Sequence, residues 1–180
     1  MKTPEHPIFL ESIKYIRSKL GITGLDQVQQ SILERIIHSS GDFGLQSCIR
    51  FSSRACEEGI NALKNGAMIL TDTHMAGAAI SPMSKRTLDT DIQCILGRAP
   101  ISIDSALTTR SSIGMKNIWL EFEERDNLLN SPLVVIGSSP TALISLLDLI
   151  EAVYRNPSLI IGLPVGFIGV AESKNRLLNS

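Results

Sequence analysis

The sequence predicts an α/β fold, a single domain with a mainly parallel β-sheet and helices on both faces. Four short apolar runs predict strands, and each leads to or follows a helical pattern, which is typical of a parallel sheet with right-handed crossovers. The stretch 132–176 repeats this alternation most clearly, as strand, glycine turn, helix, strand and glycine turn. A chain of 180 residues, 43% of them hydrophobic, can bury one real core. We therefore expect one domain over residues 1–180.

The stretch 132–176 also locates the candidate site. Leu133–Ile136 is a β-branched run that ends at a glycine, the pattern of a strand buried on both faces. Ser138, Ser139 and Pro140 favour a helix start, since a hydroxyl can cap free amides and proline suits the first turn. Leu159–Leu163 repeats the strand signal before a second loop rich in glycine. Ligands of open α/β sheets lie outside the carboxyl ends of the strands, so we place the site at these two turns. A second helix is expected after the second turn.

The first third of the chain predicts three helices, over Pro4–Leu20, Leu25–His38 and about 52–64. The run Ser39–Gly44 is rich in turn-forming residues and predicts a loop. His38 would then occupy a helix C-terminus, whose partial negative charge favours the imidazolium form and proton donation. The alternative is that His38 only caps the preceding carbonyls, and its position alone favours that alternative.

The middle of the chain predicts a strand over Ala67–Leu70, followed by polar residues at its carboxyl end. Asp72 could face a ligand there or cap a short helix ending at Ile80, and by itself the cap is the favoured interpretation. Ser81–Thr90 predicts a polar, solvated loop, and Ile92–Leu96 predicts another strand.

A helix is expected through residues 115–122, and hydroxyl residues precede it. Arg110 lies among four of them and could clasp an anion, because guanidinium binds carboxylate in a bidentate way. A surface ion pair between Arg110 and Asp104 is the alternative, equally supported by the sequence. The charged run Glu121–Asp126 predicts a solvated helix face and loop.

Composition excludes several classes of function. Net charge is −1 without a basic run, which argues against nucleic acid as a partner. No apolar run reaches the roughly 20 residues of a membrane span, and the N-terminal residues lack the apolar core of a signal peptide. The 3 cysteines form no CxxC pair, which indicates reduced thiols in a cytoplasmic chain, and the 3 histidines lack metal-ligand spacing. No GxGxxG, GxxxxGK[ST] or GxSxG motif is present, so we expect neither a nucleotide nor a metal cofactor.

Five segments occur in an order that carries a family resemblance, namely Ile37–Gly44, Gly66–Ile80, Thr109–Ser112, Gly137–Leu143 and Gly162–Lys174. Together they resemble the precorrin-8X methylmutases, also called precorrin isomerases, of corrin biosynthesis. The last segment, GLPVGFIGVAESK, is nearest to the family pattern. The resemblance covers essentially the whole chain.

The resemblance implies an isomerase that moves a methyl group from C-11 to C-12 of the macrocycle. The product is hydrogenobyrinic acid from precorrin-8X, or cobyrinic acid from cobalt-precorrin-8, and no residue pattern discriminates the two routes. The family implies a homodimer with pockets at the subunit interface and no dissociable cofactor. His38 matches its catalytic histidine, thought to protonate a ring nitrogen, and a positioned acid typically contributes a factor of ~10²–10⁴. With the resemblance, the interpretation of His38 changes from a cap to a catalytic acid.

The macrocycle carries acetate and propionate side chains, so its site requires local hydrogen-bond donors. The resemblance implies a substrate-binding set of Ser12, Thr109, Arg110, Ser111, Ser139, Thr141, Gly166 and Glu172. Backbone amides at the two glycine turns are expected as further anion donors.

Two departures from the family pattern affect these expectations. Family members continue through another strand with an RGxxGGS-like stretch and a final helix, whereas this sequence stops at Ser180. A missing strand and helix would expose a sheet edge or apolar surface and weaken folding or dimerisation. Ala78–Ser81 replaces a family glycine and threonine, which affects loop contacts to the ring. The alternative functions are a non-catalytic tetrapyrrole-binding protein and an unrelated α/β enzyme for a carboxylated metabolite.

Overall fold

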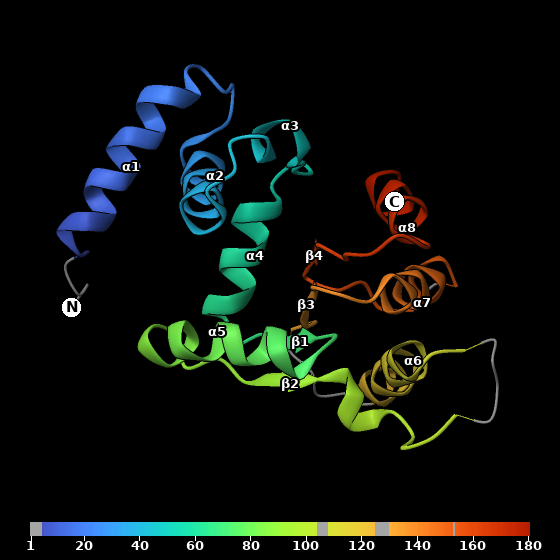
Figure 1. Cartoon of the computed structure of the whole chain (residues 1–180). Helices are drawn as coiled ribbons and strands as arrows, with labels where there is room; N and C mark the ends of the chain where they lie inside the picture. The colour runs from blue at the N-terminus through green and yellow to red at the C-terminus, as the bar shows by residue number, and fades with distance from the viewer. Residues whose placement is uncertain (1–4, 104–107, 125–129, 153) are drawn as a thin grey trace. The chain divides into compact units, whose positions relative to one another are not determined.

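The computed structural model describes residues 5–103, 108–124, 130–152 and 154–180 (Figure 1). The chain divides into two compact units, Met1–Cys56 and Glu57–Ser180, which we describe one at a time. The single domain over 1–180 stays a prediction.

The first unit is helical where the structure describes it. It contains α1 (Pro7–Leu20), α2 (Gln27–Ser40) and α3 (Leu45–Cys48). His6 caps α1 and Asp26 begins α2 through a capping box with Gln29, so both helices start at side chains that satisfy free amides. The two long helices bury one shared cluster, Ile13, Ile16, Leu20, Leu33 and Ile37.

The end of α2 differs from the prediction. Ser39 and Ser40 belong to the helix, and their hydroxyls donate to the carbonyls of Arg35 and Ile36. Gly41, with φ 71°, then ends the helix in the left-handed conformation that glycine adopts without strain. The predicted loop over Ser39–Gly44 is therefore wrong at its first two residues, and α3 was not predicted. His38 lies in the last turn of α2.

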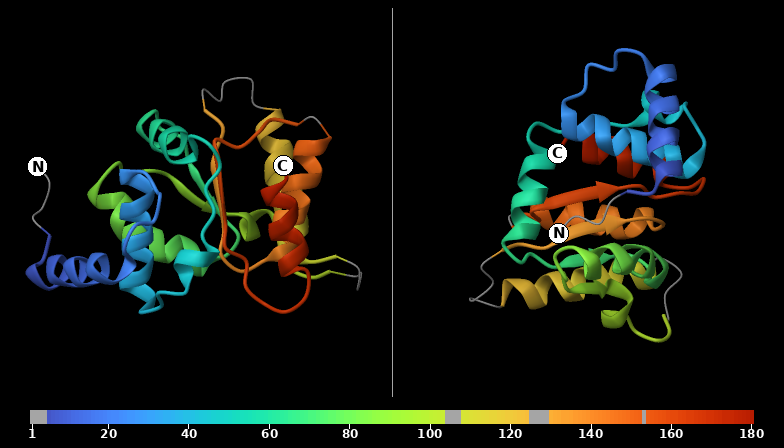
Figure 2. Two further views of the ribbon diagram at one scale, coloured as in Figure 1. Left: turned by 90° about the horizontal axis from the view of Figure 1, so that it is seen from above. Right: turned by 90° about the vertical axis from the view of Figure 1, so that its left-hand side faces the viewer.

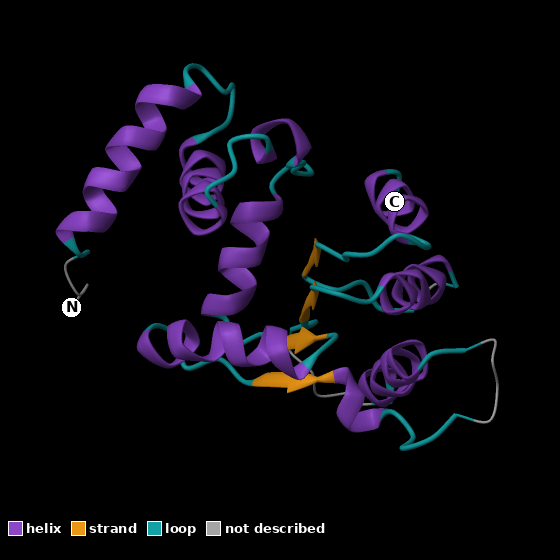
Figure 3. Cartoon of the chain, in the orientation of Figure 1, coloured by secondary structure: helices purple, strands orange, loops and turns teal. Residues whose placement is uncertain are grey.

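The second unit contains a four-stranded sheet of β1 (Ile69–Thr71), β2 (Ile92–Cys94), β3 (Leu133–Ile136) and β4 (Leu159–Gly162) (Figure 3). The strand order is β2-β1-β3-β4, which the sequence did not predict, and every pairing among the described residues is parallel, as the sequence predicts. Ile69 of β1 lies opposite Ile92 on one side and Leu133 on the other. The chain leaves β1 first toward β2 and later returns to β3 on the other side of β1. The carboxyl ends of β1 and β3 thus form the switch point, where ligands of such sheets bind.

Helices cover both faces of this sheet, which confirms the predicted fold class. Leu159 and the other side chains of one face pack against α4 (Ala55–Lys64) and α5 (His74–Arg86). The opposite face packs on α6 (Arg110–Glu123) and α7 (Pro140–Glu151), and α8 (Val170–Leu178) lies beside α7 (Figure 2). The alternation of strand side chains explains this division, because Leu70, Val134 and Ile136 join α6 and α7 in one core cluster.

Two middle elements differ from the prediction. The helix α5 continues to Arg86, so the predicted loop Ser81–Thr90 is wrong over its first six residues. Pro82 lies inside α5, although proline removes a helix hydrogen bond, and the helix continues past it to Ser84, which is buried and whose hydroxyl donates to the Thr90 carbonyl at 3.0 Å. The predicted strand Ile92–Leu96 ends at Cys94, and the 3-10 turn η1 (Ile95–Arg98) follows.

Candidate functional site

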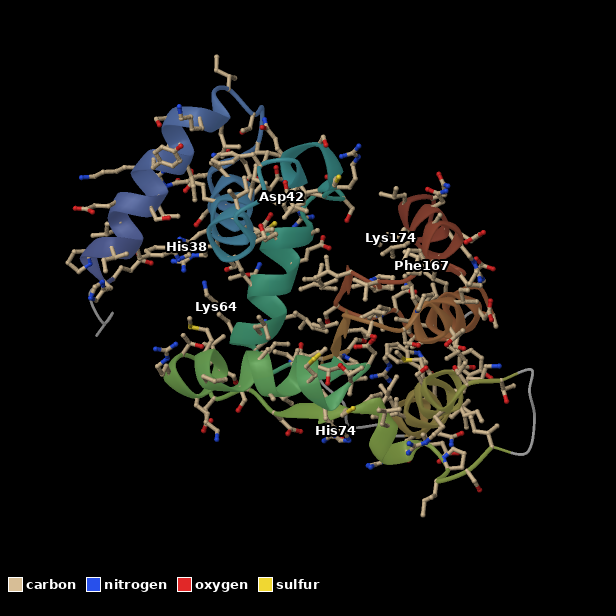
Figure 4. The ribbon with its side chains drawn as sticks, in the orientation of Figure 1. His38, Asp42, Lys64, His74, Phe167 and Lys174 are labelled. Carbon is tan, nitrogen blue, oxygen red and sulfur yellow. The ribbon has the colours of Figure 1, made fainter. Side chains whose placement is uncertain are left out.

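A histidine and a serine form the first site, in the first unit. His38 is exposed on α2 (Figure 4). Its imidazole Nδ1 lies 2.7 Å from the Oγ of half-buried Ser12 on α1. The Phe9 ring meets the imidazole edge to face, with ring centroids 5.0 Å apart and an interplanar angle of 85°. Two side chains of α1 therefore hold the ring, and Nε2 is the nitrogen left to act on a ligand.

Arg35 contacts the Phe9 ring and also forms an ion pair. The guanidinium of Arg35, one turn before His38 on α2, lies 4.8 Å from the centroid of the Phe9 ring. Arg35 also pairs with Glu5, which precedes α1. Since residues three and four apart share a helix face, the Phe9 and Ser12 side chains both reach α2. Sequence reasoning missed Phe9 and Arg35, although Phe9 lies three residues before Ser12 on the expected helix.

An ion pair between the exposed side chain of Arg17 and the buried side chain of Glu34 joins α1 to α2 in the same unit. Arg17 donates two hydrogen bonds to Glu34, at 2.8 and 2.9 Å, and the Glu34 side chain is only 2% exposed. These hydrogen bonds hold the pKa of Glu34 below its usual value, against the opposite effect of burial. Gln30 adds a further hydrogen bond to the same carboxylate, at 3.0 Å. This ion pair helps to hold α1 against α2 at the position that brings Ser12 next to His38.

Four predicted substrate-binding residues come together in the second unit. Thr109 and Thr141 lie 2.6 Å apart between hydroxyl oxygens, as do Ser111 and Ser139. Thr109 lies 3.1 Å from Ser111, and Ser139 lies 3.1 Å from Thr141. We call these four side chains the hydroxyl cluster. It stands where α6 and α7 begin, because Thr109 caps α6 and Ser139 caps α7.

Asp72 has a role that the sequence did not predict. Its carboxylate is fully buried and accepts hydrogen bonds from the amides of Gly137, Ser138 and Ser139, at 3.0, 2.7 and 2.6 Å. Thr73 caps α5 instead, so the interpretation of Asp72 as a helix cap is wrong. The amides of the first glycine turn, expected as anion donors to a ligand, are directed to this carboxylate. The pairing of strands brings these groups together, because β1 and β3 are neighbours in the sheet. Asp72 directly follows β1, and the turn that begins at Gly137 directly follows β3.

Arg110 is the first residue of α6, next to the hydroxyl cluster. Its Nε donates to the carbonyl of Pro100 at 2.8 Å, and the side chain is exposed. The alternative partner, Asp104, lies outside the described residues. Glu121 and Glu123 accept hydrogen bonds from Arg98 and from the Arg155 amide, whereas residues 125 and 126 of the charged run are outside the described part.

The loop between β4 and α8 contains Gly166 and leads to Glu172, the two remaining predicted residues. Gly166 has φ 131°, a conformation that side chains rarely allow, and Glu172 lies exposed in the first turn of α8. A Cβ on Gly169 would lie 3.6 Å from Pro140, so the loop ends against the start of α7. The loop is apolar, and its Phe167 is fully exposed (Figure 4).

No group of three or more His, Cys, Asp or Glu side chains is arranged to hold a metal ion in the part of the chain that the structure describes. The three cysteines are free thiols, and burial raises the pKa of Cys56 and of Cys94. Among the described helices, none has the length and apolar character needed to cross a membrane.

The parallel sheet, with polar side chains gathered after β1 and β3, defines the class of open α/β domains that bind ligands at the switch point. The family model described as precorrin-8X methylmutase matches residues 7–180, and the chain belongs to this family. Family membership makes it an isomerase, an intramolecular transferase.

Individual relatives agree with this assignment. The chain is 34% identical to cobalt-precorrin-8 methylmutase of Synechocystis sp., covering 96% of this chain and 82% of the relative. It is also 34% identical to precorrin-8X methylmutase of Pseudomonas aeruginosa, covering 94% of this chain and 79% of the relative. The crystal structure of precorrin-8X methylmutase from Thermus thermophilus superposes with a TM-score of 0.83 at 29% identity, covering 96% of this chain and 81% of that one.

Proposed function

We propose that this protein moves a methyl group from C-11 to C-12 of precorrin-8X or cobalt-precorrin-8, in cobalamin biosynthesis. The product is hydrogenobyrinic acid or cobyrinic acid, an isomer of the substrate. The observation that carries the proposal is the Ser12–His38 hydrogen bond, in a chain of the methylmutase family. It supports His38 as an oriented proton donor, which this rearrangement needs.

His38 acts as the acid through Nε2. In the imidazolium both ring nitrogens donate, so Nδ1 donates to the Ser12 oxygen and Nε2–H is directed to a ring nitrogen of the substrate. Protonation makes the conjugated macrocycle a better electron sink, and the bond from the methyl group to C-11 breaks as the bond to C-12 forms. The proton then returns to His38, so that no atom is gained or lost. Phe9 restricts the imidazole to this orientation.

The hydroxyl cluster binds an acetate or propionate group of the macrocycle. Hydroxyls rotate, so the four side chains that share hydrogen bonds with one another can direct O–H groups to an incoming carboxylate. Arg110 adds the positive charge that makes such hydrogen bonds stronger. Gly166 in the β4–α8 loop and Glu172 in the first turn of α8 line the site, and the exposed Phe167 offers apolar surface to the flat ring.

The test is absorbance during incubation with precorrin-8X and, separately, with cobalt-precorrin-8, because the methyl shift changes the conjugation of the ring. Wild type is expected to convert one of them, and His38→Ala to lose a factor of ~10²–10⁴ in kcat. His6→Asn is the matched control, because His6 is also exposed and asparagine keeps a side-chain oxygen that can cap α1. Binding without conversion by wild type would instead support a non-catalytic tetrapyrrole-binding protein. If wild type neither binds nor converts either compound, both the proposed isomerase and the tetrapyrrole-binding alternative are contradicted.

We also propose that the protein is a homodimer, as the family resemblance implies. Light scattering coupled to gel filtration measures this directly, and a mass of one 19.6 kDa chain at micromolar concentration would contradict it.

A further inference from the structure

The switch point of the sheet contains a buried charge of the protein itself. Asp72 follows β1, and residues 137–139 follow β3, the neighbouring strand. Three amides of this turn donate to the two oxygens of Asp72, whose side chain is fully buried. Such a set of convergent amides at the start of a helix is a site for an anion. Asp72 therefore occupies the place that a ligand's anionic group takes in many open α/β sheets.

We propose that Asp72 is a positioning residue that orients the hydroxyl cluster for substrate binding. The inference rests on the proposed role of the cluster as a carboxylate site. The shortest of the three bonds, at 2.6 Å, comes from the amide of Ser139, and it holds the backbone from which the Ser139 hydroxyl projects. That hydroxyl contacts both Ser111 and Thr141, so any shift of Ser139 displaces the centre of the cluster.

The chemistry of the three donors explains why a carboxylate is required. A carboxylate only accepts, and its two oxygens can receive all three N–H groups. An asparagine of the same shape would direct its own N–H groups at one or more of these amides, and the turn would have to move. The positive end of the α7 dipole also favours a negative charge at this position. The substrate carboxylate consequently meets hydroxyls, while the amides of this turn stay with Asp72.

The test compares Asp72→Asn with Asp89→Asn, an exposed site with the same change of charge. We expect Asp72→Asn to raise KM for the macrocycle roughly 5- to 100-fold and to change kcat less than about 3-fold, because His38 is untouched. Asp89→Asn should match wild type. If Asp72 acts through the cluster, its substitution costs less in a Ser139→Ala background, whereas a general loss of structure would lower activity equally in both.

Each outcome separates the two proposals. An inactive wild type contradicts the proposed function before Asp72 is considered. An active wild type with Asp72→Asn indistinguishable from Asp89→Asn, or with a fall in kcat alone, overturns only the role of Asp72. Where Asp72→Asn does not fold, Asp72→Gly in sodium formate takes its place, since formate can fill the space facing the three amides. Recovery of folding and of wild-type KM in formate, but not in chloride, supports the proposal, and no recovery in formate contradicts it.

Discussion

Removing the Ser12 hydroxyl tests how much of the activity depends on the orientation of His38. Ser12→Ala deletes the oxygen that lies 2.7 Å from Nδ1 and leaves the Phe9 contact in place. The imidazole keeps its position on α2 but loses the hydrogen bond that selects its rotation. We therefore expect a partial loss of kcat.

The magnitude follows from the single hydrogen bond that is lost. Such a bond contributes about 0.5–1.5 kcal/mol, and each 1.36 kcal/mol on the barrier changes the rate by about tenfold. The expected fall in kcat is therefore about 2- to 13-fold. His38→Ala, which removes the acid itself, is expected to cost a factor of ~10²–10⁴. The two substitutions should differ by at least about eightfold.

The assay is the rate of the absorbance change at saturating substrate, for Ser12→Ala and for Ser18→Ala. The control removes a hydroxyl from the same helix, where Ser18 donates to the carbonyl of Tyr15. Ser18→Ala should keep the wild-type kcat. A wild-type kcat for Ser12→Ala would refute the orienting role, and a loss as large as that of His38→Ala would show that Ser12 does more than orient the ring.

The remaining predictions concern the framework that holds the sites. In Gly114→Ala the new Cβ would lie 2.4 Å from the Ile95 carbonyl oxygen, so we expect a destabilisation of about 1–3 kcal/mol and a Tm lower by roughly 2–12 °C. Gly97→Ala, which meets open space, is the control, and an equal fall in Tm for both would contradict the steric argument. Hydrogen bonding to Arg17 lowers the pKa of Glu34 in the folded protein below its usual value of 4.5. The ion pair therefore stabilises the folded state in full at pH values above 4.5, and this stabilisation is lost as pH falls through the lowered pKa. Urea unfolding of wild type and Arg17→Met should thus differ at pH 7 and converge in acid, and a constant difference would count against this.

Local sequence patterns were enough to predict many of the helices and strands. Leu133–Ile136 is a strand with the predicted bounds, because a short apolar β-branched run carries its preference within itself. Ser139 caps α7 as expected, since a hydroxyl before a proline at the first helical position is a local signal. The parallel direction of the strands also followed from the alternation of strands and helices, whereas their order in the sheet did not.

The candidate site was predictable only in part. The resemblance named Ser12 and His38 as site residues, but not the hydrogen bond between them or the supporting contact of Phe9. It likewise named the hydroxyl cluster without showing that residues from the starts of α6 and α7 bond to one another. These contacts join helices that are distant along the chain, and helical periodicity carries no information about them.

What only the tertiary structure decided is clearest at Asp72 and Pro82. From local patterns, Asp72 is a helix cap and the polar run that contains Pro82 is a loop, but the first prediction is wrong and the second is wrong over residues 81–86. The partners of Asp72 lie 65 to 67 residues away along the chain, brought close by the pairing of β1 with β3. The sequence by itself thus determined the family and most of the helices and strands, the strands and helices through preferences that act within a few residues, but not α3 or the ends of α2 and α5. Packing decided which polar groups meet, because buried donors and acceptors must find partners wherever the fold places them.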